Sequence, residues 1–379
     1  MDVGRYESAG NAALTPPRYA GVMSTRIAPI QWLRALAATL VLLMHASDMI
    51  ESGPVAVTGK LMPTIPNLST FGASGVDLFF VISGFVMAQS LSTSDHNPRP
   101  FLAKRWLRIV PLFACVSAVY MMIMHDALTV QAAIMSITVL PIFDGAGYHA
   151  PALYPGWTLG FEFAFYAVVA AAMRAPRRRI ETLLALTVGC AVVGCFVHPA
   201  WAPARLLLNP LLLEFALGVI VWITWQRGIS ARIAAPALIT GVVLLAIGIA
   251  FGLGFPLSLQ IDVAVEGVSG LPRTWTWGIP WALVVIGLID TVAKGRFERI
   301  VARVGDASYS TYLTHPCLIA LLWMAGGNIP TMSPYIFAAA FIVASSMLGL
   351  AVHGWIERPL LAWLQRRPPV SIRRAAVLA

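Results

Sequence analysis

The sequence predicts an all-α, polytopic membrane protein with about ten transmembrane helices and both termini in the cytoplasm. Of the 379 residues, 58% are hydrophobic and only 11% are charged, whereas a soluble domain carries about 25% charged residues. Apolar runs of roughly 20 residues, the length needed to cross a bilayer, recur along the chain. Lys and Arg are concentrated in alternate connecting segments, which is the pattern of a protein whose positive loops stay in the cytoplasm.

The apolar runs define the individual spans. The predicted spans are residues 30–50, 71–91, 106–124, 157–173, 180–197, 208–226, 233–255, 277–293, 308–325 and 335–355. A shorter apolar run at 128–143 is interrupted by Gln131 and closed by Pro141. We interpret that run as an interfacial or re-entrant segment.

The basic residues give the orientation. With the N-terminus inside, 22 of the 26 Lys and Arg residues fall in cytoplasmic segments, and the outer loops contain only Lys60, Arg205 and Arg273. The remaining one, Arg34, lies within the first span. The net charge of +9 is therefore explained by residues that face anionic lipid headgroups, and no nucleic-acid partner is expected.

The two ends of the chain differ from the apolar middle. Residues 1–27 mix Gly, Ser, Pro and charges without periodicity, which predicts a flexible cytoplasmic tail. Residues 28–365 form one transmembrane domain, and 366–379 a basic cytoplasmic tail. No small-residue cleavage site follows the first apolar segment, so no removable signal peptide is expected. The four cysteines lack metal-ligand spacing, and we expect neither a disulfide framework nor a metal site.

The first span contains two residues that are costly in lipid, Arg34 and His45. They are eleven residues apart, which is nearly three helical turns, so both lie on one face with about 16 Å between them along the axis. Ionisable residues inside a membrane mark functional sites by default. The alternative is a snorkelling arginine and a histidine that hydrogen-bonds a neighbouring helix, but the shared face favours a functional pair.

Three carboxylates are predicted at the depth of His45. Asp77, Glu162 and Glu214 each lie five or six residues below the outer end of a span. One intramembrane carboxylate is often structural. Three of them beside a histidine favour a polar active cavity or a substrate pathway.

This group suits proton transfer. A neutral imidazole accepts a proton from a hydroxyl, and an adjacent carboxylate, here Glu162 or Asp77, fixes the tautomer and stabilises the imidazolium. No nucleophilic Ser or Cys stands beside them, and Ser83, next to Gly84, is expected to pack against a helix. Direct attack by an acceptor that His45 activates is therefore expected, with no covalent enzyme intermediate.

Two further groups of residues lie toward the predicted cytoplasmic side. Arg105 and Arg108, at i and i+3, put two guanidiniums on one helix face, which is typical of a phosphate clamp. Ordinary flanking charge is the alternative. Later, Tyr309, Tyr312 and His315 open the ninth span, and Glu357 closes the last one at a depth where it can pair with Arg34 or the two other arginines.

Taken together, these segments resemble the acyltransferase family 3 membrane proteins, most closely the group that O-acetylates exopolysaccharides. The resemblance covers Ile30 to about Leu364 and depends on motifs that occur in order. They are the Arg34–His45 pair, GVDLFFVISGF at 75–85, RWLRIVP at 105–111, GWTLGFEFAFY at 156–166, LLEFALG at 212–218, SYSTYLTHP at 308–316 and ERP at 357–359. Gly160 is a departure, since many relatives carry Ser or Asn there.

The resemblance implies ten core spans in a bacterial cytoplasmic (inner) membrane. It also implies acyl transfer, usually of acetyl, from cytoplasmic acyl-CoA to a carbohydrate hydroxyl, with acetyl-CoA as donor substrate and no permanently bound cofactor. Roles follow for His45 as base, for Glu162 and Asp77 beside it, and for the donor-binding Arg34, Arg105 and Arg108. We expect substrate contacts from Trp157, Tyr166, Glu214, Tyr309 and His315.

Two alternatives stay open from the sequence. A layer of histidine and carboxylates also describes a proton-coupled transporter. The same chemistry can serve another acceptor, such as a lipid-linked sugar, a macrolide-like small molecule or a glycan of the cell surface. Acceptor contacts are expected from the loops 125–156 and 256–276, which carry no recognisable code.

Overall fold

The fold was analysed in a computed structural model. It describes residues 27–52, 67–93, 97–124, 130–140, 142–144, 147–175, 177–253, 261–292, 295–326 and 332–366. The predicted tails, apart from Ile27 and Arg366, lie outside these described residues.

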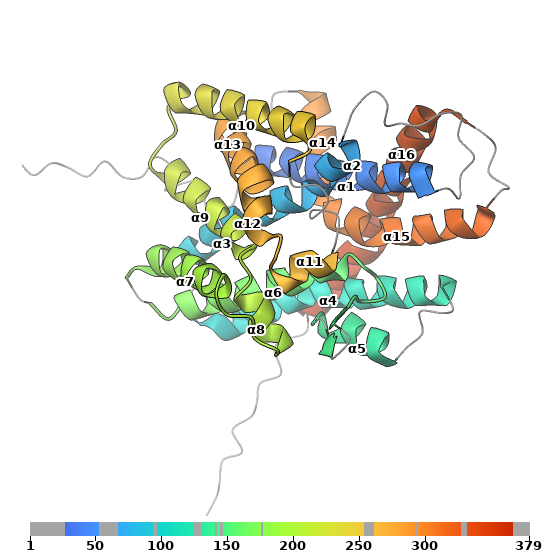
Figure 1. The fold of residues 1–379 in the computed structure, drawn as a ribbon, viewed down its shortest axis with the longest axis horizontal. Helices are drawn as coiled ribbons and strands as arrows, with labels where there is room; N and C mark the ends of the chain where they lie inside the picture. Colours follow the sequence, from blue (N-terminus) through green and yellow to red (C-terminus); the bar gives the residue numbers. More distant parts are fainter. Residues whose placement is uncertain are drawn as a thin grey trace, which may run out of the picture.

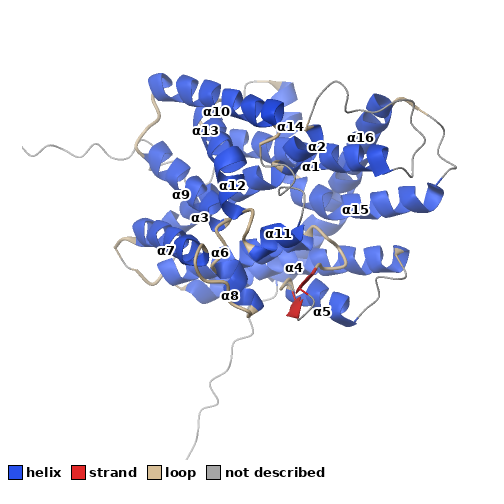
Figure 2. Ribbon diagram, in the orientation of Figure 1, coloured by secondary structure: helices blue, strands red, loops and turns tan. Residues whose placement is uncertain are grey.

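Helices make up nearly all of the described chain, and several of the long ones run along the long axis of the molecule (Figures 1 and 2). The longer helices are α1 (Ala28–Ser52), α3 (Gly75–Thr93), α4 (Pro98–Ile123), α6 (Gly156–Ala172), α7 (Arg179–Gly194), α9 (Leu212–Gln226), α10 (Ala231–Phe251), α13 (Ile279–Leu288), α15 (Ser308–Ala325) and α16 (Pro334–Val352). The shorter ones are α2 (Leu68–Ala73), α5 (Val130–Thr138), α8 (Ala202–Leu207), α11 (Ile261–Glu266), α12 (Gly270–Arg273), α14 (Arg296–Asp306) and α17 (Arg358–Arg366), with π-helical turns η2 (Thr274–Gly278) and η4 (His353–Glu357). A helix lies in each of the ten predicted spans.

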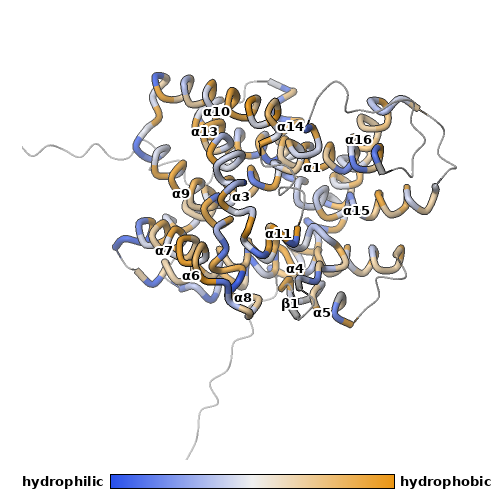
Figure 3. Tube along the Cα trace, viewed as in Figure 1, coloured by the Kyte–Doolittle hydropathy of each residue, from blue (hydrophilic) through white to orange (hydrophobic). Residues whose placement is uncertain are grey.

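The prediction of a helical membrane protein is confirmed. Within the described chain, five helical segments are long and apolar enough to cross a membrane: Ala28–Glu51, Leu68–Thr93, Pro98–Ile123, Ala231–Phe251 and Pro334–Gln365. In α10, only 17% of the most apolar stretch is buried inside the protein, and in the segment α16–α17 the share is 28%. Figure 3 shows that α10 is apolar along most of its length. Such outward apolar faces are what a lipid environment requires. Ten crossings and cytoplasmic termini stay predictions.

One part of the described chain is not helical. The strands β1 (Ile142–Asp144) and β2 (Gly147–His149) pair antiparallel, with Ile142 opposite His149 and Asp144 opposite Gly147. The described part of the run 128–143, which is predicted as an interfacial or re-entrant segment, contains α5 and the first two residues of β1. Its place at the membrane interface stays a prediction.

Close backbone contacts hold α1, α3 and α9 together at the centre. A Cβ atom added to Gly84 of α3 would overlap the carbonyl oxygen of Phe215 in α9, and one added to Gly75 would overlap the carbonyl oxygen of Ala37 in α1. Small residues of this kind let membrane helices approach closely. The sequence assigns this packing role to Ser83, but Gly84 fills it, so the Ser83 side chain is left to make a polar contact.

Candidate active site

The first of two neighbouring cavities contains the three arginines that the sequence predicts as donor ligands, and we call it the arginine cavity. Arg34 enters it from α1, and Arg105 and Arg108 enter from α4. Both arginines of α4 face one way because they are three residues apart on a helix. The sequence places the three at one end of the protein, and the structure brings all of them into the lining of one cavity.

Glu162 and two tyrosines complete the arginine cavity. The carboxylate of Glu162 accepts a hydrogen bond of 2.9 Å from the Ser83 hydroxyl. The Arg105 guanidinium lies over the Tyr166 ring, 5.8 Å from its centroid, which is within the range of a cation–π contact. The Tyr309 hydroxyl donates to the Ile109 carbonyl oxygen at 2.7 Å. Glu162, Arg105 and Tyr309 are thus each held by a contact with a neighbouring residue.

The arginine cavity has an excess of positive charge. Three guanidiniums line it, against the one carboxylate of Glu162. Among the residues that the structure describes, no carboxylate lies within ion-pair distance of Arg34 or Arg108. Arginine presents a rigid fork of donors that suits phosphate and carboxylate groups. The cavity is therefore built to accept an anionic group.

The second cavity, which we call the histidine cavity, contains His45 and His315. The two imidazole rings stack with their centroids 5.0 Å apart, and the Tyr154 ring lies 5.2 Å from that of His45. Asp48, Trp157 and Arg273 also line this cavity. The sequence places His315 toward the cytoplasmic side and His45 toward the outer side, but the structure brings the two rings to the same level.

The hydrogen bonds of His315 indicate its tautomer. Its Nδ1 atom lies 3.4 Å from the Thr311 carbonyl oxygen, and its Nε2 atom lies 3.3 Å from the Tyr154 hydroxyl. A carbonyl oxygen only accepts, so Nδ1 carries the hydrogen and Nε2 accepts from Tyr154 in the neutral ring. His315 is completely buried, and these contacts hold its ring flat against His45.

The carboxylate beside His45 is Asp48, three residues further along α1. The Oδ2 atom of Asp48 lies 3.7 Å from Nδ1 of His45. The sequence predicts Glu162 or Asp77 in this place and does not single out Asp48. The spacing of three residues on one helix was the signal that could have indicated it.

Glu162 lies in a different layer from His45, contrary to the prediction of one common depth. Its partner Ser83 is six residues beyond Asp77 on α3, a rise of about 9 Å. The physical reason is the height of α6 in the bundle. Counting residues along α6 does not give the height at which this helix packs against α3, where Ser83 contacts Glu162.

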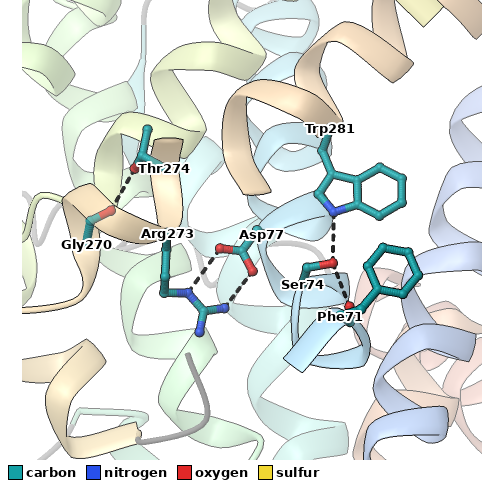
Figure 4. A network of polar contacts seen from close by, with 7 residues as sticks. All are labelled: Phe71, Ser74, Asp77, Gly270, Arg273, Thr274 and Trp281. Carbon is teal, nitrogen blue, oxygen red and sulfur yellow. Dashed lines mark hydrogen bonds and ion pairs between the residues drawn. The ribbon is translucent and has the colours of Figure 1, made fainter. Parts of the chain in front are cut away.

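Asp77 forms a buried ion pair with Arg273 (Figure 4). The Arg273 Nε and Nη2 atoms donate to the two oxygens of Asp77 at 3.0 and 2.6 Å, and both side chains are at most 2% exposed. The sequence assigns Arg273 to an outer loop and so misses this partner. The sequence did contain a signal for this pair. A carboxylate inside a membrane needs a cation, and Arg273 lies at the start of a later span.

Two other predicted residues lie apart from both cavities. Glu214 is completely buried behind the Asp77–Arg273 pair, against Gly278, and lines neither cavity. Glu357 accepts hydrogen bonds from the Ser310 hydroxyl at 2.6 Å and contacts Nδ1 of His353 at 2.7 Å. The sequence instead suggests an arginine as its partner. Glu357 is thus held by polar contacts with two neighbouring side chains, and Glu214 is enclosed by packing.

One of the two loops predicted to contact the acceptor, 256–276, reaches the histidine cavity through Ile261 of α11. The Asn209 amide holds α11 in place, because it donates to the carbonyl oxygens of Ala264 and Val265 at 2.9 and 3.1 Å. Part of that loop, 256–260, lies outside the described residues. The other predicted loop supplies Tyr154 to the same cavity.

Comparison with known proteins identifies the family. Residues 27–351 match the model of the acyltransferase domain family. The chain belongs to acyltransferase family 3. It is 33% identical to the exopolysaccharide production protein ExoZ of Rhizobium meliloti, over 77% of this chain and 90% of that protein. It is 24% identical to the acyltransferase MdmB of Streptomyces mycarofaciens, over 94% of this chain and 96% of MdmB. No solved structure was found to match.

Family membership decides between the two classes of function that the sequence leaves open. The chain is an O-acyltransferase, a multi-pass membrane enzyme of family 3. This finding supports the enzyme over the transporter.

Proposed function

We propose that this acyltransferase moves an acetyl group from cytoplasmic acetyl-CoA to a hydroxyl of an exopolysaccharide or its lipid-linked precursor, in the bacterial cytoplasmic membrane. The observation that carries the proposal is the pair of neighbouring cavities, one rich in arginine and one containing two stacked histidines. The likeness to ExoZ, named for exopolysaccharide production, supports a carbohydrate acceptor.

The arginine cavity suits the donor. Acyl-CoA carries several phosphate charges at one end of a long, thin arm and its thioester at the other end. Arg34, Arg105 and Arg108 would bind the phosphates, since bidentate contacts to phosphate are the strongest that guanidinium groups make. Arg34 and His45 lie on one face of α1, about 16 Å apart along its axis. An acyl-CoA with its phosphates at Arg34 and its thioester at His45 would span this distance with its arm extended.

The histidine cavity suits the reaction. His45 accepts the proton of the sugar hydroxyl as its oxygen attacks the thioester carbonyl carbon. A carbon–oxygen bond forms, the carbon–sulfur bond breaks, and the proton passes from His45 to the leaving sulfur, so that the products are the ester and free CoA thiol. Asp48 stabilises the imidazolium that forms on the way. His315, packed against His45, holds the ring in position.

The test is the ester content of extracellular polysaccharide from cells with and without this protein. We expect O-acetyl groups to be lost without the protein and restored by the wild-type chain, but not by His45→Ala at equal protein level. Purified enzyme should release CoA thiol from acetyl-CoA when polysaccharide from the deficient cells is added. Unchanged ester content together with no thiol release would overturn the proposal.

A further inference from the structure

Two side chains, Val76 of α3 and Tyr312 of α15, line both cavities. They are therefore the partition between the arginine cavity and the histidine cavity. Each cavity has a volume of about 140 Å³, and the proposed donor would extend from the arginine cavity into the histidine cavity. A group that moves from the arginine cavity into the histidine cavity would pass these two residues, because they line both cavities.

Tyr312 is fixed in this partition from several sides. The Thr158 hydroxyl donates its hydrogen to the Pro155 carbonyl oxygen at 2.9 Å, so the contact of 3.2 Å between Thr158 Oγ1 and the Tyr312 hydroxyl has Tyr312 as its donor. The Tyr312 ring lies 5.9 Å from the rings of both Phe79 and His315. These neighbours confine the ring, and the width of the passage is set by packed side chains.

We infer that Val76 and Tyr312 limit the size of the transferred acyl group, so that the enzyme selects acetyl over longer straight-chain acyl groups. This inference rests on the proposed function, because it assumes an acyl-CoA donor in the arginine cavity. When the acyl chain is too long, its end overlaps the side chains of this apolar wall, and the overlap excludes it. In enzyme pockets, one methylene of misfit changes specificity roughly 10- to 200-fold.

The decisive variant is Val76→Ala, which removes two methyl carbons from the partition without adding a polar group. Room for about two methylenes should admit a butyryl group. We expect the kcat/KM ratio of butyryl-CoA to acetyl-CoA to rise at least tenfold. The opposite change, Val76→Leu, should lower acetyl transfer while acetyl-CoA binding is kept.

The matched control is Val86→Ala. Val86 lies on the same helix and lines the arginine cavity but not the histidine cavity. The same loss of volume there should leave the ratio of butyryl to acetyl transfer at the wild-type value. Tyr312→Phe, which keeps the ring and loses only the hydroxyl, should also leave that ratio unchanged.

The assay measures release of CoA thiol from acetyl-CoA or butyryl-CoA by purified enzyme with polysaccharide from cells that lack it, and identifies the ester formed by mass spectrometry. If wild type transfers acetyl and Val76→Ala keeps the wild-type ratio, the inference about the partition is overturned and the proposed function stands. If wild type consumes neither donor, the proposed function fails. Binding of acetyl-CoA by each variant shows that it is folded.

Discussion

The Asp48 carboxylate lies 3.7 Å from Nδ1 of His45, one turn further along the same helix. Both residues belong to α1, so their backbone spacing does not depend on the other helices. The Asp48 side chain is 47% exposed and that of His45 is 16% exposed. His45, the base of the proposed reaction, is therefore oriented by a residue of its own helix. Its partner Asp48 is in contact with solvent.

Replacing Asp48 with Asn should lower kcat about tenfold and leave the KM for acetyl-CoA unchanged, because a charge-assisted contact to the imidazolium is worth about 1.5 kcal/mol or more. Steady-state kinetics of the purified enzyme measure both constants. Glu51→Gln is the control, since Glu51 is an exposed acid of the same helix that lines neither cavity. Equal kinetics for Asp48→Asn and wild type would contradict a role for this pair.

Arg105→Ala and Arg108→Ala should each raise the KM for acetyl-CoA roughly 10- to 100-fold with a smaller effect on kcat. Each variant removes a charged hydrogen-bond donor worth about 1.5–3 kcal/mol. The control Arg178→Ala removes an exposed arginine from the chain just before α7 and should keep the wild-type KM. The phosphate clamp would be refuted by a wild-type KM in both α4 variants.

Arg273→Met should destabilise the protein by about 3–5 kcal/mol, because it leaves the buried Asp77 carboxylate without its partner. Thermal unfolding in detergent measures the loss. The double variant Asp77→Leu, Arg273→Met should recover part of it, since both charges are then removed and the effects of contacting residues are not additive. A double variant as unstable as the sum of the two single variants would argue against the pair.

Gly84→Ala should destabilise the fold severely or prevent accumulation of the protein in the membrane. The added methyl group overlaps the Phe215 backbone, and α3 and α9 would have to separate. Gly189→Ala on α7 is the matched control, because nothing lies within 4 Å of a Cβ at that position. That control should be neutral or more stable by up to about 1 kcal/mol. Membrane yield and thermal unfolding distinguish the two.

Much of the fold and of the site could be predicted from the chain itself. A helix lies in each of the ten predicted spans, because apolar runs in a membrane have to satisfy their backbone hydrogen bonds internally. Arg34, Arg105 and Arg108 share one cavity as expected, and His45 lines a polar one. Helical spacing fixes which side chains share a face, and this much does not depend on the neighbouring helices.

Only the tertiary structure decided which residues of different helices meet. Glu162 lies with the arginines, and Arg273 pairs with Asp77. Val76 and Tyr312 are the shared wall of the two cavities. Sequence determines the position of a residue along its helix, but not the height at which that helix enters the bundle or its rotation there. Those two quantities are set by contacts between distant segments, such as Gly84 on Phe215 and Ser83 on Glu162.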